Sequence, residues 1–205
     1  SSDLYANFIL LNNGTVLSAG DNTAGVLGTG DIGTRNVFGA VIGISSQAIG
    51  VACGRYTSSI LLNTGVVKSN GRNNYGQLGT NDTSARSTTV PMVNISTAIA
   101  VSQGLYHAAI LLNNGTVWST GLNQFGQIGN GVSAVGATVL TPVPALGLSS
   151  QAIGVSAGSS HTLVLLNDGR VMSVGLNNFG TLGLNDVVTR STLCFVVGIS
   201  SQAIA

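Results

Sequence analysis

The chain has 205 residues, of which 44% are hydrophobic and only 6% are charged, against roughly 25% charged in a typical soluble domain. Seven Lys and Arg side chains face six Asp and no Glu, so the net charge is +1. Seven scattered cations exclude the basic stripe of a nucleic-acid-binding protein, and no apolar run reaches the roughly 18 residues of a membrane-spanning helix. The 29 glycines argue against long helices, because Gly costs about 1 kcal/mol relative to Ala inside a helix.

An internal repeat of about 51 residues organises the chain, and three blocks define it. The first block, LLNNGTV at 10–16, has counterparts at 61–67, 111–117 and 165–171. The second block, GRNNYGQLG at 71–79, returns at 121–129, at 175–183 and, more loosely, at 20–28. The third block, SSQAI at 45–49, recurs at 149–153 and 200–204, with STAI at 96–99.

Each repeat predicts four strands in chain order. An apolar strand such as 59–62 precedes a pair such as Asn13-Gly14, which favours a tight hairpin whose two turn residues both have positive φ. A short alternating strand such as 117–120 follows, then a Gly-rich loop, a strand around 90–93 and a buried strand at 98–102. Four-stranded units with this period are typical of propeller blades.

The sequence therefore predicts an all-β fold, a β-propeller of four tandem four-stranded blades. The repeats form a single domain over residues 1–205, with repeat cores at 3–53, 54–103, 104–157 and 158–205. The aromatic residues of the second block are expected to lie in the core between blades; they are Tyr75, Phe125 and Phe179.

The two chain ends match one internal junction. Residues 200–205 match 45–50, and residues 1–5 align with 52–56, so tail and head together rebuild one blade junction with a single residue missing. We therefore expect a terminal blade shared between the N- and C-terminal ends. The missing strand comes from the same chain, from another copy or from further repeats, and we favour a second copy. Its contacts would involve the strand from Ile199 to Ala205 and the strand from Ser1 to Leu11.

The repeat resembles a known family. The succession L-x-N-x-G-x-V, G-x-N-x-[FY]-G-Q-[LI]-G and A-I-x-V-x-x-G-x-x-H is similar to the regulator of chromosome condensation repeat, over essentially the whole chain. The resemblance implies a β-propeller, usually of seven blades, that serves as a protein-interaction platform. The founding member of the family is a guanine nucleotide exchange factor that also binds chromatin.

The chain departs from that family in three ways. It has four repeats instead of seven, and it has no basic extension for chromatin. Trp often precedes the Gly after the second strand in the family, and here other residues stand at those positions: Ala19, Asn70, Thr120 and Val174.

Acidic and basic residues recur in step in the Gly-rich loops. One position holds Asp31, Asp82 and Asp186, and the position four residues later holds Arg35, Arg86 and Arg190. The third repeat lacks both members, with Val132 and Gly136 in their places. This joint loss predicts an Asp–Arg pair within each loop. The alternative is an acid–base role for the three carboxylates.

Histidine and tyrosine mark the turn before the apolar strand. His107 and His161 are repeat equivalents, which suggests either a turn residue of the family's motif or a metal site on adjacent blades. We favour the turn residue and predict no metal. Tyrosines precede that position in three repeats, at Tyr5, Tyr56 and Tyr106. These tyrosines, together with His107 and His161, are rim candidates for binding a partner, and the alternative for the tyrosines is packing on the next blade.

Four Asn-x-Ser/Thr sequons are candidate glycosylation sites if the protein enters a secretory route; they begin at Asn13, Asn81, Asn94 and Asn114. The weakly charged surface of Ser, Thr, Asn and Gly favours a packed subunit or an extracellular, surface-exposed or virion-associated location, with a cytoplasmic one left open.

The sequence predicts a non-catalytic structural or interaction propeller, a subunit of a larger homo-oligomeric or filamentous assembly. It has no Glu, two His and no Ser/His/Asp or metal motif, so we expect neither an enzyme nor a cofactor. One alternative is a specific protein-binding propeller, such as a secreted inhibitor or an exchange factor. Another is a lectin-like glycan binder with polar pockets between blades.

Overall fold

The computed structural model describes residues 5–199, 203 and 204, and these form strands, turns and loops without a helix. Blade 1 consists of β1 (Ala6–Leu10), β2 (Val16–Gly20) and β3 (Arg35–Ala40). Blade 2 consists of β4 (Ala48–Cys53), β5 (Thr57–Leu62), β6 (Val67–Gly71) and β7 (Arg86–Pro91). Blade 3 consists of β8 (Ala98–Gln103), β9 (His107–Leu112), β10 (Val117–Leu122) and β11 (Thr138–Pro144). Blade 4 consists of β12 (Ala152–Ala157), β13 (His161–Leu166), β14 (Val171–Gly175) and β15 (Arg190–Phe195).

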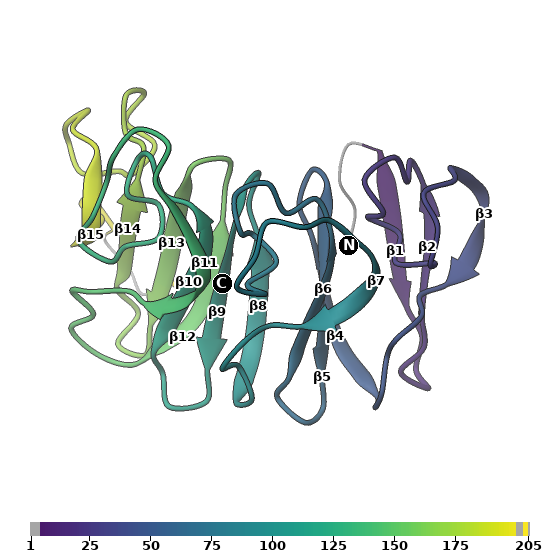
Figure 1. The fold of residues 1–205 in the computed structure, drawn as a ribbon. Helices are drawn as coiled ribbons and strands as arrows, with labels where there is room; N and C mark the ends of the chain where they lie inside the picture. The colour runs from purple at the N-terminus through teal and green to yellow at the C-terminus, as the bar shows by residue number, and fades with distance from the viewer. Residues whose placement is uncertain (1–4, 200–202, 205) are drawn as a thin grey trace.

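Within each blade the strands are antiparallel and lie in the order of the chain. The four sheets stand side by side in a row, with β3 at one end and β15 at the other (Figure 1). This arrangement confirms the predicted all-β propeller fold. Among the described residues, no helix is long and apolar enough to span a membrane.

The central hairpin of each blade differs from the predicted turn. Gly14 has a φ of 81°, but Asn13 is not among the residues with positive φ. The amide of Gly14 donates to the carbonyl of Leu11 at 2.9 Å, and the amide of Leu11 donates to Thr15 at 2.9 Å. The chain therefore makes a three-residue hairpin loop over residues 12–14, a β-turn followed by one left-handed Gly, instead of the predicted two-residue loop.

Apolar layers between successive blades form the core. Ile60 and Leu62 of blade 2 pack against blade 1, in a cluster that includes Phe8. Leu61, the residue between them, points the other way and packs against Ile110 of blade 3. Because successive side chains of a strand point to opposite faces, a sheet buried on both faces needs a continuous apolar run. This explains why the second strands of blades 2 and 3 each end in three successive apolar residues, 60–62 and 110–112, instead of an alternating pattern.

The last described residues belong to the same pattern. The amide of Ala203 donates to the carbonyl of Gly169 in blade 4 at 3.1 Å, as the amide of Ala98, the first residue of β8, donates to the carbonyl of Gly65 at 2.9 Å. Ala203 thus stands where an inner strand starts, beyond blade 4. At the opposite end of the row, blade 1 has three strands among the described residues, against four in each of the other blades. The shared terminal blade stays a prediction, since residues 1–4, 200–202 and 205 lie outside the described part of the chain.

Candidate functional site

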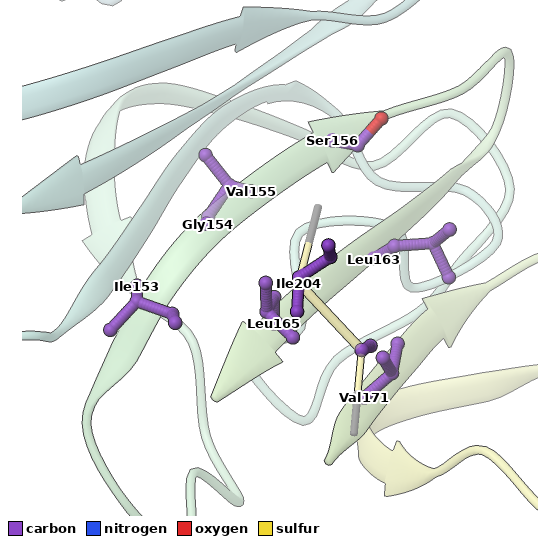
Figure 2. Close-up of a pocket in the computed structure, with 9 residues that line it drawn as sticks. Ile153, Gly154, Val155, Ser156, Leu163, Leu165, Val171 and Ile204 are labelled. Atoms are coloured by element: carbon purple, nitrogen blue, oxygen red, sulfur yellow. The ribbon is translucent and has the colours of Figure 1, made fainter. Parts of the chain in front are cut away.

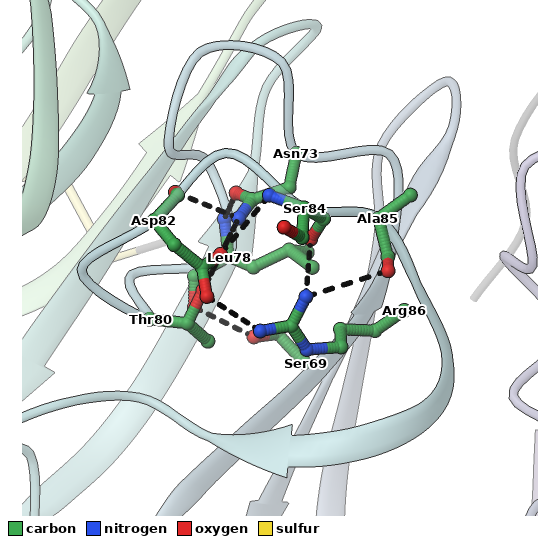
Figure 3. A network of polar contacts seen from close by, with 8 residues as sticks. All are labelled: Ser69, Asn73, Leu78, Thr80, Asp82, Ser84, Ala85 and Arg86. Atoms are coloured by element: carbon green, nitrogen blue, oxygen red, sulfur yellow. Dashed lines mark hydrogen bonds and ion pairs between the residues drawn. The ribbon is translucent and has the colours of Figure 1, made fainter.

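A buried asparagine organises each Gly-rich loop. In blade 2, Asn73 donates from Nδ2 to the backbone oxygen and to Oδ1 of Asp82, both at 2.9 Å, and accepts at Oδ1 from the amide of Leu78 at 3.0 Å (Figure 3). An asparagine donates and accepts equivalent hydrogen bonds within the loop of every blade, at Asn22, Asn73, Asn123 and Asn177. The sequence analysis did not single it out, although Asn occupies the third position of the second block in all four repeats.

The structure brings the recurring acidic and basic residues together within each loop. Arg86 Nη2 lies 2.5 Å from Asp82 Oδ2, and the hydroxyl of Thr80 and the amide of Ser84 also donate to this carboxylate (Figure 3). The corresponding distances are 2.7 Å for Asp31–Arg35 and 2.5 Å for Asp186–Arg190. Each of these carboxylates is paired with the arginine of its own loop, so the geometry supports a role in loop order.

Hydrogen bonds and charge set the pKa of these carboxyl groups. Burial, the largest single influence on Asp82, raises its pKa, but the Ser84 amide and the Arg86 guanidinium outweigh it and the net pKa is lowered. In blade 3, where both partners are missing, Asn130 Oδ1 and the carbonyl of Val132 accept from Asn123 instead, at 3.0 and 2.9 Å. A neutral loop therefore closes on the same asparagine.

A further ion pair lies at the blade 4 hairpin. Arg170 Nη2 lies 2.6 Å from Asp168 Oδ2, and its guanidinium carbon is 4.3 Å from the centroid of the Phe195 ring. The side-chain hydrogen bond from Arg170 lowers the pKa of Asp168 to about 2. The sequence analysis missed this pair because it does not recur in the other repeats.

His107 is fully buried between blades 3 and 4. Its Nε2 lies 2.9 Å from Thr162 Oγ1, and that hydroxyl donates its proton to the carbonyl of Gln127 at 3.0 Å. The hydroxyl therefore accepts from Nε2–H, and Nδ1 carries a lone pair with no hydrogen-bond partner. Burial lowers the pKa of His107 to about 4 and also lowers that of the half-buried His161. Within the described ranges, no group of three or more His, Cys, Asp or Glu residues could hold a metal ion.

The rim tyrosines have different surroundings in each blade. The Tyr56 ring lies beside two guanidinium groups, with Arg55 Cζ 5.0 Å and Arg72 Cζ 3.9 Å from the ring centroid. The Tyr106 ring meets the Tyr75 ring edge-on, with centroids 5.0 Å apart and an interplanar angle of 64°. The sequence analysis missed both arginines.

The two arginines could have been found in the sequence because they differ from the residues at the equivalent positions of the other repeats. At the position of Arg55, blades 3 and 4 carry Leu105 and Ser159. At the position of Arg72, the same blades carry leucine at 122 and 176. Tyr5, the blade 1 equivalent of Tyr56, is exposed.

The two ends of the row expose apolar residues. Beyond blade 4 lies a groove of about 550 Å³ lined by Leu163, Leu165, Val171 and Ile204, among others (Figure 2). At the other end, Ile9 is 41% exposed, whereas its repeat equivalent Ile60 is fully buried.

The expectation that Phe179 lies in the core is wrong. Its ring is 85% exposed, because its equivalent Tyr75 packs on a tyrosine of the following blade and no described blade follows blade 4. Tyr75 and Phe125, which do have a following blade, are half-buried. The aromatic residue at this position is thus partly buried where another blade follows and exposed where none of the described blades follows.

The sequons lie on turns. Asn13 and Asn114 are exposed at hairpin tips, and each accepts at Oδ1 from the amide two residues on, at 3.0 Å. Asn81 and Asn94 are exposed in loops, with φ values of 62° and 61°. All four side chains are therefore on the surface, as glycosylation would require.

Comparison with protein families identifies the repeats. Two models of the regulator of chromosome condensation (RCC1) repeat match, one at residues 98–127 and 152–181 and the other at 114–165. Both matches fall in blades 3 and 4, and the internal repeat carries the same pattern into blades 1 and 2.

Solved structures share the fold at low sequence identity. The crystal structure of human WBSCR16 has a TM-score of 0.81 and 19% identity, covering 94% of this chain and 50% of that one. The crystal structure of Kap60 bound to yeast RCC1 (Prp20) has a TM-score of 0.80 and 16% identity, covering 98% and 51%. The structure of Prp20p from Saccharomyces cerevisiae, described together with its binding to Gsp1p and histones, has a TM-score of 0.80 and 18% identity. That match covers 98% of this chain and 52% of Prp20p. The chain spans about half the length of these proteins.

Proposed function

Because the chain belongs to the regulator of chromosome condensation (RCC1) repeat family, we propose that it is a non-catalytic protein-interaction propeller. A yeast protein of the same fold was crystallised with a protein bound to it, and its binding to further proteins is described. The recurring Asp residues of the Gly-rich loops and the buried His107 are engaged in loop and interblade contacts, which supports a binding role over a catalytic one.

We propose further that the partner at the two ends is a second copy of the chain. The main observation behind this proposal is that the exposed faces of blade 4 and blade 1 correspond to the two sides of the interface between successive blades. Inside the chain, Leu61 and Val67 of one blade pack on Ile110 and Leu112 of the next. Blade 4 presents the first half, with Leu165 and Val171 in its groove.

Blade 1 presents the second half of the same interface. Ile9 and Leu11, the equivalents of Ile110 and Leu112, are 41% and 37% exposed. Two halves on opposite ends of one molecule make a head-to-tail contact, which closes into a ring or extends as a filament. Burying such apolar surface provides about 25 cal/mol per Å².

The inner strand adds backbone complementarity to this contact. Among the described residues, blade 1 has three strands, and Ala203 lies beyond blade 4 at the position where the inner strand of a blade starts. Strand addition to a blade supplies main-chain hydrogen bonds along the added strand. We infer that the segment from Ile199 to Ala205 of one copy completes blade 1 of the next.

Matched surface variants test the head-to-tail contact. Ile9→Asp charges the blade 1 end and Phe179→Asp charges the blade 4 end, while Val135→Asp charges an apolar side chain that is 99% exposed in a loop. By light scattering, the unmodified chain and Val135→Asp are expected above the 20.5 kDa monomer mass, and each end variant at that mass.

Mixing the two end variants identifies the polarity of the contact. Ile9→Asp keeps an intact blade 4 end and Phe179→Asp keeps an intact blade 1 end, so an equimolar mixture should form a dimer that cannot grow. A contact between like ends would instead leave one variant dimeric by itself. A chain that stays monomeric at micromolar concentration would refute self-association.

A second candidate function is a specific protein binder that uses one rim of the propeller. The arginine and tyrosine cluster of blade 2 favours it, because Arg and Tyr are enriched among the residues that dominate binding energy at protein interfaces. Such a rim would operate whether or not the ends are occupied.

A further inference from the structure

The positive charges of this chain are unevenly compensated. Four arginines each lie within 2.7 Å of an Asp oxygen: Arg35, Arg86, Arg170 and Arg190. The ammonium of Lys68 donates to the carbonyl of Gly43. Arg55 and Arg72 have no carboxylate partner in the part of the chain that the structure describes, and both flank the ring of Tyr56. The uncompensated guanidinium groups are thus gathered at one place.

The place is one rim of blade 2. Arg55 and Tyr56 form the turn between β4 and β5, and Arg72 follows β6 directly. The amide of Arg72 donates to the carbonyl of Tyr56 at 2.8 Å, which ties the two segments together. Both arginine residues are half-buried, and Arg55 Nε is buried without a hydrogen-bond partner. Among the described residues, neither guanidinium has an acceptor, and unpaired donors on a cation are costly, so their remaining N–H groups are free for the acceptors of a partner.

The other blades show that the fold does not need these arginines. Blades 3 and 4 build the same rim with Leu105 and Ser159 at the first position and with leucines 122 and 176 at the second. Folding of the blade therefore does not explain why arginine stands at these two positions, and a role in binding does.

We propose that Arg55, Tyr56 and Arg72 bind an acidic segment of a protein partner, with its Asp or Glu carboxylates paired to the guanidinium groups. A guanidinium held against an aromatic ring keeps its N–H edge free, and that edge matches a carboxylate with two parallel hydrogen bonds. This inference rests on the proposed role in protein binding but uses a surface separate from the two ends.

An acidic protein segment fits better than a nucleic acid. Nucleic-acid affinity grows with the number of neutralised phosphates, and two cations in a chain of net charge +1 supply few. A short peptide needs only one or two well-placed pairs, because hydrogen bonds to charged groups contribute about 1.5–3 kcal/mol each.

Fluorescence anisotropy with defined probes tests the site. The probe is a labelled peptide of alternating Glu and Phe, and a second probe replaces every Glu with Gln. The full chain should bind the Glu probe and bind the Gln probe at least about tenfold more weakly, since one charged hydrogen bond corresponds to about a decade in affinity. Added salt should weaken the Glu probe more than the Gln probe.

Variants borrowed from the other blades locate the binding. Arg55→Leu and Arg72→Leu should each weaken the Glu probe about tenfold. Lys68→Leu removes the same charge from the same blade and should change affinity by less than about twofold. Arg72→Lys keeps the charge but loses the planar fork, so it should bind with intermediate strength.

Several outcomes would overturn the proposal. They are equal loss for Lys68→Leu, equal binding of the Glu and Gln probes, no binding of the Glu probe, or tighter binding of a labelled single-stranded DNA of the same length. The Glu-to-Gln comparison on the unmodified chain keeps the test decisive even if a variant fails to fold. Repeating the titration on Ile9→Asp separates the two proposals, because rim binding should persist where self-association is lost.

Discussion

Ile9 and Ile60 occupy the same position of the repeat, yet Ile9 is 41% exposed and Ile60 is fully buried. β5 and β9 are buried at every residue, whereas β1, with the same role in blade 1, alternates between buried and exposed. The sequence of a blade thus specifies which face is apolar, but burial depends on the blade that stands next to it. An internal blade has both apolar faces covered by neighbouring blades, whereas an end blade leaves one apolar face exposed.

The largest expected effect separates these two settings directly. Ile60→Ala removes a fully buried side chain between blades 1 and 2 and should lower the free energy of unfolding by about 3 kcal/mol. Ile9→Ala, the matched change at the open end, should cost about 1 kcal/mol or less in the monomer. Urea unfolding followed by circular dichroism measures both. Equal costs would mean that the end of blade 1 is covered in solution, even in a monomer.

Acid should weaken the internal interface between blades 3 and 4. The folded-state pKa of His107 is about 4, below its ordinary value of 6.5, so the unfolded chain takes up the proton first. Stability from this group is therefore fully present above pH 6.5 and is lost as pH falls towards 4, by about 3 kcal/mol in total.

Denaturant unfolding between pH 7 and 4 checks this expectation. His107→Thr, which copies the residue of blade 2, is the control and should flatten the slope of stability against pH. An unchanged slope would show that the proton is taken up elsewhere, for example at His161, whose pKa burial also lowers.

A smaller loss is expected when a loop loses its buried asparagine. Asn73→Ala removes hydrogen bonds to Asp82 and to the Leu78 amide and leaves that amide buried without its acceptor. We expect a cost of about 2 kcal/mol in the free energy of unfolding. Asn74→Ala, one residue on and exposed, should cost less than about 0.5 kcal/mol. Similar melting temperatures for the two variants would refute the role of Asn73.

The smallest effect is expected from the partly exposed ion pair. A double-mutant cycle on Asp82 and Arg86 should give a coupling energy of about 0.5 kcal/mol, because solvent screens a pair of this exposure. Zero coupling would mean that the two residues contribute to the loop separately. Blade 3, which closes its loop without either residue, is the natural reference for a neutral design.

Much of the fold could be predicted from the repeat. Its period, its glycines and its apolar runs predict four strands per unit, and the structure has them in three blades. The hairpin type was predicted wrongly, because an Asn-Gly pair fits two turns and only the closing bond to Leu11 decides between them. The Asp82–Arg86 contact could be predicted because both residues are absent together from the third repeat. The Asp168–Arg170 pair occurs in one repeat, so no such pattern pointed to it.

The sequence by itself determined what each blade is, because period, turn residues and alternation are local properties of the chain. Only the tertiary structure decided what surrounds each position. Phe179 was expected in the core and lies exposed, since the surface that would cover it belongs to a following blade. Arg55 and Arg72, which are 17 positions apart in the chain, meet over Tyr56 because antiparallel strands bring two turns to one rim. Neighbours across blades and across turns are set by packing in space, and a repeat in sequence does not record them.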